Sequence, residues 1–297
     1  MKLKKHLLNQ YLWALLFIAP TMIGLFILNV WPIIQTLFLS FTKSGDFGKF
    51  VFVGFATIKK VLGDAEVWKS TWNTFLYTIM VVPISTVLAL IFAVLINQEI
   101  KGRTLLRLMF FIPVVSTPAA VAMVWKWLYN GDYGLINFVT SKLIGIRINW
   151  LTAPSIVMVS LAIVGIWMVV GYNMILFLAG LQGIPKTYYE AAHVDGAGKI
   201  FQFFNITIPL VSPTTFFVVV ITMIQSLQIF DIIYMMVDKL RNPAYPEAQT
   251  LAVLFYRNGF IIHDKSAASV VVFLLFSIIM LITILQFVFQ KKWVHYE

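Results

Sequence analysis

Residues 70–98 read STWNTFLYTIMVVPISTVLALIFAVLINQ, a stretch without any Asp, Glu, Lys or Arg. A helix that crosses the roughly 30 Å hydrocarbon core of a bilayer needs about 20 mostly apolar residues, so this stretch is long enough for one such helix. Five further uncharged stretches reach a sufficient length, and none of the six could hold two helices and a turn. The six stretches are Leu7–Thr42, Ser70–Gln98, Leu108–Trp125, Ile148–Pro185, Ile200–Phe230 and Ser266–Gln290.

These stretches predict an all-α membrane protein with six transmembrane helices. A closed β-barrel would instead show short segments of alternating hydrophobicity. Lys126 is expected at the edge of the third helix, where its ammonium group can reach the lipid headgroups. The helices are expected near Tyr11–Leu39, Trp72–Ile96, Leu106–Leu128, Ser155–Gly180, Thr207–Met235 and Ala267–Gln290.

The composition of the 297-residue chain excludes a water-soluble protein. Hydrophobic residues make up 60% and charged residues 11%, and the mean hydropathy is +0.89, whereas globular chains are roughly 45–50% apolar and about 25% charged. The net charge of +10 fits basic residues beside a lipid bilayer rather than nucleic acid binding. Because the chain has no cysteine, disulfides, thiolate metal sites and cysteine nucleophiles are excluded.

An even number of spans places both termini on one side of the membrane. Met1–Gln10, Asn97–Arg107 and Lys291–Glu297 carry a higher density of Lys and Arg than the loops of the opposite side, which favours cytoplasmic termini. The first apolar stretch is too long for the core of a signal peptide and no cleavage site follows it, so it is expected to remain a span. Turn-forming residues follow the third and fifth spans at Asn130–Gly134 and Arg241–Pro246.

The segment between the fourth and fifth spans predicts a short cytoplasmic helix. Pro185 ends the incoming element, and Thr187 and Glu190 have the spacing of a capping box at a helix start. Gly196 and Gly198 supply the stop. Because a helix of two to three turns is marginal alone in water, it is expected to dock against another protein.

A lipid-surface helix is the alternative for this segment. Such a helix needs a strong apolar face with basic flanks. Ala191 and Ala192 are small and weakly apolar, and Glu190 and Asp195 are disfavoured beside anionic headgroups. Protein docking is therefore the favoured interpretation.

Catalytic chemistry is not expected in this chain. Residues 196–199 resemble the end of a phosphate-binding loop, but His193 and Ile200 stand where that pattern needs Gly and Ser or Thr. The four histidines have no metal-ligand spacing. Five of the six spans carry no ionisable group at depth and the fifth carries Asp231 near its end, which disfavours a proton-driven transporter.

The short helix also carries a family motif. Tyr189-Glu190-Ala191-Ala192, three residues, Gly196, nine residues and Ile206-Thr207-Ile208-Pro209 resemble the Glu-Ala-Ala loop of the permease subunits of binding-protein-dependent ABC importers. Ile208 stands where the family has leucine. Matches that are similar to the carbohydrate-uptake branch of this family are Trp31-Pro32, Trp72-Asn73-Thr74, Phe111-Ile112-Pro113, Gly171-Tyr172-Asn173, Ala179-Gly180-Leu181-Gln182, Val194-Asp195-Gly196-Ala197 and the carboxyl-terminal residues 291–297.

The resemblance implies an ABC type-1 transmembrane domain in a prokaryotic cell membrane. A homologous second permease, two ATP-binding subunits and an extracytoplasmic solute-binding protein would be its partners, and a sugar its substrate. ATP and Mg²⁺ would bind to the ATPase subunits, with no cofactor in this chain. The implied organisation is residues 1–71 as the tail, first span and first outer loop, residues 72–290 as the transporter core with its loop at 181–209, and residues 291–297 as a tail. The implied ATPase-coupling residues are Tyr189, Glu190, Ala191, Ala192, Asp195, Gly196, Ile206 and Pro209.

Two stretches depart from the sugar permeases of this family. Residues 239–243 replace a common Gly-Gly-Pro turn, and Asp264–Ser269 replace a Gly-Tyr-Ala-Ser-like run. Both stretches would face the binding protein.

Polar residues on the fifth span predict a substrate path. Gln225, Gln228 and Asp231 are three residues apart, which on a continuous helix places them along one side, and Tyr172 and Asn173 on the fourth span could add a ring and an amide. Interhelical hydrogen bonding is the alternative for these residues. A self-contained secondary transporter or channel for small polar solutes, or a membrane scaffold without a transport role, are the alternatives for the whole chain.

Overall fold

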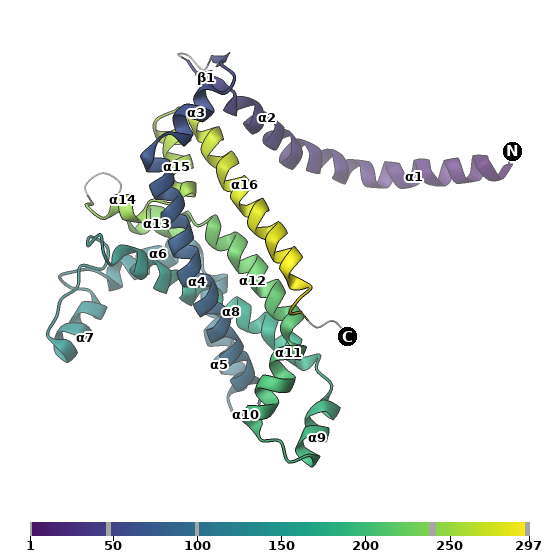
Figure 1. The fold of residues 1–297 in the computed structure, drawn as a ribbon, viewed down its shortest axis with the longest axis vertical. Helices are drawn as coiled ribbons and strands as arrows, with labels where there is room; N and C mark the ends of the chain where they lie inside the picture. Colours follow the sequence, from purple (N-terminus) through teal and green to yellow (C-terminus); the bar gives the residue numbers. More distant parts are fainter. Residues whose placement is uncertain (1, 46–48, 99–100, 238–241, 295–297) are drawn as a thin grey trace. The chain divides into compact units, whose positions relative to one another are not determined.

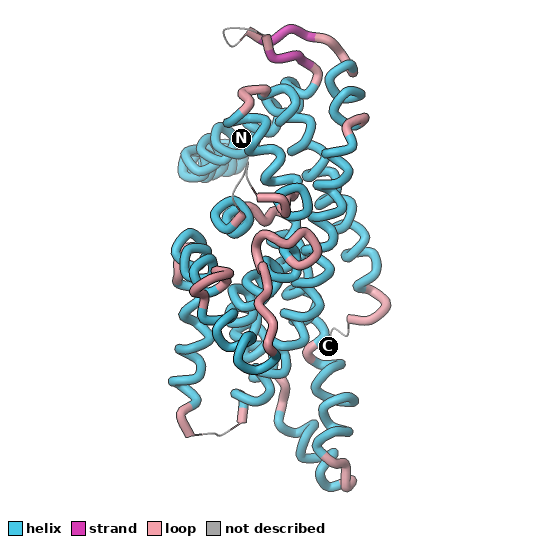
Figure 2. Tube along the Cα trace, turned by 90° about the vertical axis from the view of Figure 1, so that its left-hand side faces the viewer, coloured by secondary structure: helices cyan, strands magenta, loops and turns pink. Residues whose placement is uncertain are grey.

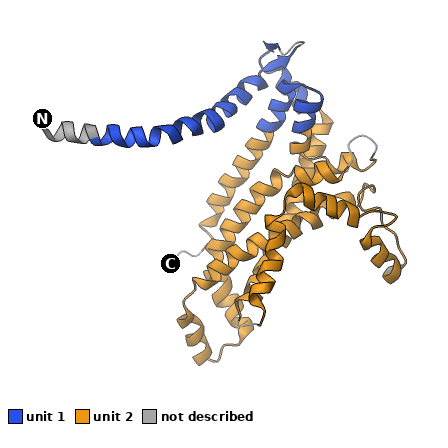
Figure 3. Ribbon diagram, turned by 180° about the vertical axis from the view of Figure 1, so that it is seen from behind, with its two compact units in different colours: residues 1–63, 255–273 blue, residues 64–254, 274–297 orange. Residues whose placement is uncertain are grey.

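The computed structural model describes residues 2–45, 49–98, 101–237 and 242–294. The chain divides into two compact units (Figure 3): Met1–Gly63 with Phe255–Phe273, and Asp64–Leu254 with Leu274–Glu297. Within the described residues, strands occur in a single two-stranded ribbon and helices account for most of the rest (Figure 2). The expected all-α class is therefore confirmed apart from this ribbon.

The first unit begins with a long apolar helical run. It consists of α1 (Lys2–Leu25), the π-helical turn η1 (Phe26–Val30) and α2 (Trp31–Ser40), and Gln10–Ser40 is long and apolar enough to cross a membrane. The π turn ends two residues before Pro32, whose ring has no N–H and crowds the carbonyl group four residues earlier. The predicted first span is confirmed.

A polar contact fastens the ribbon of the first unit to the start of α16 (Lys265–Gln290). Strand β1 (Thr42–Ser44) pairs antiparallel with β2 (Phe50–Phe52). The Thr42 and Ser266 hydroxyl oxygens lie 2.9 Å apart, and the Ser266 N–H donates to Ser44 Oγ over 3.0 Å. The remaining elements of this unit include α3 (Ala56–Leu62), the end of α15 (Leu251–Tyr256) and the π turn η4 (Arg257–Ile261).

The second unit is built around α4 (Ala65–Asn97) and α8 (Val157–Gln182), which pack side by side (Figure 1). These helices contain the predicted second and fourth spans, and α16 contains the sixth. The other helices of the unit are α5 (Arg103–Val115), α6 (Pro118–Leu128), α7 (Leu135–Ile144), α9 (Lys186–Val194), α10 (Lys199–Gln202), η3 (Phe203–Thr207), α11 (Ile208–Leu210), α12 (Ser212–Leu227), α13 (Asp231–Met236) and α14 (Tyr245–Ala248).

The third span is two helices rather than one. α5 and α6 meet at an angle of 101°. Ser116 and Thr117 between them are extended, with ψ near 140°, because the residue before Pro118 is disfavoured in the helical region. The Thr117 hydroxyl then accepts from the Ala120 N–H and caps α6.

The fifth span is also broken, so the predicted continuous helix Thr207–Met235 is wrong. Lys199–Leu210 and Ser212–Leu227 meet at 64°, because Pro213 has no N–H to offer the Pro209 carbonyl oxygen. Ser212 Oγ donates to this oxygen over 2.6 Å instead. Four uninterrupted helices are long enough to span a membrane, and the count reaches six when each bent pair is taken as one span.

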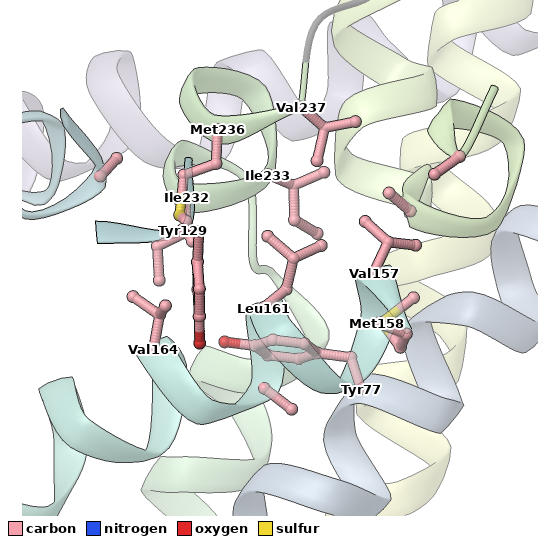
Figure 4. Packing of buried hydrophobic residues seen from close by; sticks show 14 of the residues in the cluster. Tyr77, Tyr129, Val157, Met158, Leu161, Val164, Ile232, Ile233, Met236 and Val237 are labelled. Atoms are coloured by element: carbon pink, nitrogen blue, oxygen red, sulfur yellow. The ribbon is translucent and has the colours of Figure 1, made fainter. Parts of the chain in front are cut away.

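Two clusters of buried side chains hold the second unit together. The first gathers Tyr77 from α4, Tyr129 after α6, Leu161 from α8 and Ile233 from α13 (Figure 4). The second joins small residues of α4 to large ones of α8 and α12, and includes Ala89, Ala93, Met174, Phe177 and Val218. The small α4 residues allow close approach of the helix backbones.

Two glycines of α8 let its neighbours approach to backbone contact. A Cβ atom on Gly171 would overlap the Phe110 carbonyl oxygen of α5, and one on Gly180 would overlap the Thr214 hydroxyl of α12. Both glycines belong to the stretches of the fourth span that resemble sugar permeases. Glycine is therefore needed at these two positions for the close packing of α8 against α5 and α12.

Gly171→Ala is expected to destabilise the protein, since the added methyl group must displace the α5 backbone. We expect a loss of about 1–3 kcal/mol in the free energy of unfolding, the usual range for overpacking. Thermal unfolding of the purified full chain in lipid measures it. Gly24→Ala is the matched control, since nothing lies within 4 Å of a Cβ there. Equal stability of both variants would contradict the packing role.

Candidate functional site

The candidate docking loop leaves α8 at Gln182 and enters α9 at Lys186. Pro185 precedes the helix with φ −60° and ψ 133°, and no side chain caps the helix start. The predicted capping box between Thr187 and Glu190 is therefore wrong. Because Lys186 is already helical, Thr187 is the second residue of the helix, and its hydroxyl is not at the N-cap position that the box requires.

The end of α9 is built as the sequence predicts. Gly196 has φ +77°, a left-handed conformation that glycine adopts readily. Its N–H donates to the His193 carbonyl oxygen over 3.0 Å, and the Ala197 N–H donates to the Ala192 carbonyl oxygen over 2.9 Å. This pair of bonds is a Schellman motif, and it turns the chain sharply away from α9 after Asp195.

The returning limb Lys199–Leu210 is bonded to α9 by side chains. The Tyr189 and Thr207 hydroxyl oxygens lie 3.0 Å apart, and Tyr189 also packs against the second hydrophobic cluster. Gln202 Nε2 donates to the Ala197 carbonyl oxygen over 2.9 Å. Tyr189 therefore fixes the helix to its own chain, a role that the motif by itself did not indicate.

The opposite side of α9 has no cover from the part of the chain that the structure describes. None of its residues is buried in the described structure. Glu190, Ala191 and Asp195 are exposed, and Ala192 is half-buried. In the returning limb Ile206 and Pro209 are half-buried. The arrangement presents a short, anchored helix whose carboxylate and alanine side chains remain accessible.

The residues of the expected substrate path do not lie on one helix. α12 ends at Leu227, Gln228 has φ −95° and ψ 10°, and Asp231 is the first residue of α13. The inferred stripe along a continuous helix is therefore wrong. Gln225, Gln228 and Asp231 are nevertheless all exposed, so each is accessible to a substrate or to a partner chain.

The two expected path residues of the fourth span differ in environment. Asn173 is 1% exposed. Its Nδ2 donates to Thr222 Oγ1 over 3.0 Å, and Thr222 Oγ1 lies 3.3 Å from Asn173 Oδ1, so this amide bonds α8 to α12. Tyr172 is 38% exposed. Of this pair, only the tyrosine ring is accessible.

A polar anchor on α4, which the sequence reasoning missed, holds the segment after the fifth span. Asn73 is 4% exposed, and its Nδ2 donates to the carbonyl oxygens of Pro246 and Gln249, each over 2.9 Å. Thr74 Oγ1 accepts from the Leu251 N–H over 3.0 Å. A buried amide inside an apolar helix is the signal that could have identified this anchor.

The anchored segment in turn supports the break in the fifth span. Thr250 Oγ1 donates to the Ile229 carbonyl oxygen over 3.1 Å, which lies between Gln228 and Asp231. Asn242 Oδ1 accepts from the Ala244 N–H, which confirms part of the turn predicted at Arg241–Pro246. Residue 241, with 238–240, lies outside the described residues. The turn at 130–134 is confirmed by the bonds that Asn130 Oδ1 accepts from two following N–H groups.

Asn73→Leu is expected to destabilise the protein although leucine is similar in size to asparagine, because the buried carbonyl oxygen of Gln249 and the partly buried one of Pro246 lose their donor. Each buried group left unsatisfied costs about 1–3 kcal/mol. Lys69→Gln, one turn away on α4, is the control. It removes an exposed ion pair with Glu247 at 2.8 Å, a kind of pair that contributes about 0–1 kcal/mol. Thermal unfolding of the full chain measures both, and equal losses would contradict the role of the anchor.

Sequence comparison places the chain among transport permeases. It is 32% identical over 301 residues to the probable ABC transporter permease protein YesP of Bacillus subtilis, covering 100% of this chain and 96% of that protein. It is also 32% identical to the trehalose/maltose transport system permease protein MalF of Thermococcus litoralis, over 91% of this chain and 90% of that protein. The sulfoquinovosyl glycerol transport system permease protein SmoG of Agrobacterium fabrum is 32% identical, with 93% and 89% covered.

Solved structures share the fold. A bacterial ABC transporter involved in the import of the acidic polysaccharide alginate matches with a TM-score of 0.86 at 21% identity, over 98% of this chain and 99% of that chain. The MetNI methionine ABC transporter matches with a TM-score of 0.55. The expected ABC importer membrane-domain fold is thus confirmed. Residues 65–295 match the family described as the binding-protein-dependent transport system inner membrane component, and the chain belongs to this family of integral inner-membrane permeases.

Proposed function

We propose that this chain is one of two membrane-spanning subunits of an ATP-driven sugar importer. A homologous second permease would complete the translocation path, and two ATP-binding subunits would hold ATP and Mg²⁺ and hydrolyse the nucleotide. The proposal rests above all on α9. This helix is fixed to its own chain by Tyr189 and the Schellman turn, yet it presents Glu190 and Ala191 without cover in the described structure.

The physical form of α9 suits the transmission of motion. A helix of 9 residues is marginal by itself, so its two anchored ends are needed to keep it helical. The anchors also connect it to α8 and, through the returning limb, to α12. A push on α9 from an ATPase subunit would therefore reach two membrane-spanning helices.

The names of relatives support a sugar as the substrate. One relative is a trehalose/maltose permease and another a sulfoquinovosyl glycerol permease. The alginate transporter has also been solved with a pentasaccharide-bound periplasmic protein, which supports an extracytoplasmic solute-binding protein as a partner of this chain. We place the protein in a prokaryotic cytoplasmic membrane with both termini in the cytoplasm, following the distribution of Lys and Arg.

Membership of the permease family weighs against a self-contained secondary transporter or channel. Such a protein has no need of an anchored inner helix with an uncovered face. It would also need its own energy coupling, whereas the chain carries few ionisable groups within its apolar helices.

Ala192→Trp and Glu190→Ala are expected to uncouple transport from ATP hydrolysis. The indole would overfill the docking surface, at about 1–3 kcal/mol by analogy with overpacked cores, and the second change removes a charge that a basic ATPase residue could bind. Substrate-stimulated ATP hydrolysis of the reconstituted importer measures the effect. Ala65→Trp, at the exposed start of α4, is the matched control. Unchanged coupled turnover in both test variants would refute the assignment of α9.

Gln228→Leu tests the substrate path. The side chain is exposed at the break between α12 and α13, so its amide can bond sugar hydroxyls. We expect reduced sugar uptake with assembly and basal ATP hydrolysis intact. Loss of assembly would instead make the residue a contact with the second permease, and an unaffected uptake would remove it from the path.

A further inference from the structure

A polar hollow of about 210 Å³ lies in the second unit at the end of α6. Its walls come from three separate stretches: the end of α6 with the turn that follows, residues 149–152 before α8, and the residues on either side of 238–241 after α13. The polar side chains that line it include Lys126, Asn130, Asn149, Thr152 and Asn242. None of the expected docking or path residues lines this hollow.

Partly buried hydrogen bonds connect the walls of the hollow. Asn137 is 3% exposed; its Nδ2 donates to the Ile148 carbonyl oxygen over 2.9 Å, and its Oδ1 accepts from Trp150 Nε1 over 3.0 Å. Asn242 Nδ2 donates to the Leu151 carbonyl oxygen over 2.8 Å. Because Asn137 Nδ2 also donates to the Gly131 carbonyl oxygen over 3.2 Å, the three stretches are bonded to one another before any ligand arrives, a preorganisation that favours binding.

Aromatic rings supply the apolar part of the wall. Tyr129 stacks on Trp150 with ring centroids 5.3 Å apart, and its hydroxyl donates to the Ser160 carbonyl oxygen over 3.1 Å. Burial raises the pKa of the Tyr129 phenol, so this ring stays neutral and keeps its bond. Figure 4 shows Tyr129 beside Met236 of α13, which also lines the hollow.

Other polar groups of the hollow have no partner within the described part of the chain. Lys126 is exposed and forms no ion pair there, and the Asn149 amide and Thr152 hydroxyl form no hydrogen bond there. An ammonium group, an amide N–H₂ and a hydroxyl can all donate. No carboxylate is among the side chains that line the hollow, and Lys126 carries a positive charge there. The amide and hydroxyl groups beside it can donate as well as accept.

The surrounding sequence is basic as well. Residues 126–152 contain three basic residues, Lys126, Lys142 and Arg147, and one acidic residue, Asp132. The excess of positive charge favours an anion over a cation or a neutral ligand.

We propose that this hollow binds an oxyanion, a carboxylate or a phosphate, on a small hydroxyl-bearing molecule. Lys126 pairs with the charge, Asn149 and Thr152 donate hydrogen bonds, and Trp150 lies against the apolar part of the ligand. The same group is offered by a soluble sugar acid and by the headgroup of an anionic phospholipid. The inference concerns binding to this chain alone and does not depend on the proposed transport function, so the two can fail separately.

Binding to the purified full chain in phosphatidylcholine nanodiscs tests the soluble source. Glucuronate is the probe and glucose its uncharged control, with affinity measured by isothermal titration calorimetry. We expect glucuronate to bind, and Lys126→Gln and Asn149→Ala each to weaken it about tenfold, the effect of losing one bond to a charged group. Lys126→Arg should retain most of the affinity. Lys142→Gln, an exposed lysine of α7 that does not line the hollow, should have a much smaller effect than Lys126→Gln.

Native mass spectrometry tests the lipid source. Phosphatidylglycerol retained by the same variants is counted, and a loss confined to Lys126→Gln and Asn149→Ala would support the proposal with a headgroup as the ligand. Equal binding of glucose and glucuronate, or no effect of Lys126→Gln on either probe, would overturn it. So would an effect of Lys126→Gln seen only on docking of the solute-binding protein to the assembled importer, because the hollow would then receive a protein side chain.

Discussion

A backbone C=O or N–H group that loses its helical hydrogen bond inside a bilayer has no water to bond to. Each such group must therefore form a hydrogen bond within the protein. This constraint governs the second unit, because two of its predicted spans are broken. A hydroxyl stands at each break: Ser116 Oγ donates to the Ile112 carbonyl oxygen, Ser212 Oγ to that of Pro209, and Thr250 Oγ1 to that of Ile229. Proline creates the first two breaks, and the hydroxyls make them tolerable.

The third of these breaks, between α12 and α13, lies beside the residues of the candidate substrate path. Thr250 holds Ile229 from a segment that is itself held by Asn73 and Thr74 of α4. Gln228 and Asp231 lie on either side of Ile229 and are exposed. A buried amide on one helix thus determines where polar side chains leave another. Asn73 and Thr74, two residues of a stretch that resembles sugar permeases, have this physical reason.

The loop that contains α9 is also shaped by proline and glycine. Pro185 and Gly196 delimit α9 through backbone conformation alone, which explains why the helix, its length and its stop could be predicted. The capping box could not, since its residues are correctly spaced but the helix begins two residues too early for Thr187 to cap it. Tyr189 carries a motif position, yet its hydroxyl lies 3.0 Å from that of Thr207 and anchors the loop rather than facing outward.

The sequence by itself determined the class, the positions of the spans, the short helix between the fourth and fifth spans, and the family. These follow from properties that are local along the chain: the length of uncharged stretches against the thickness of a bilayer, the fixed φ of proline, the left-handed conformation of glycine, and a motif within twenty residues. The tertiary structure alone decided the bends in the third and fifth spans and the burial of Asn173 against Thr222. It also decided the hydrogen bonds of Asn73 and of Asn137. Each depends on which carbonyl or hydroxyl a distant segment brings within about 3 Å of a polar side chain, and no periodicity in the sequence records that distance.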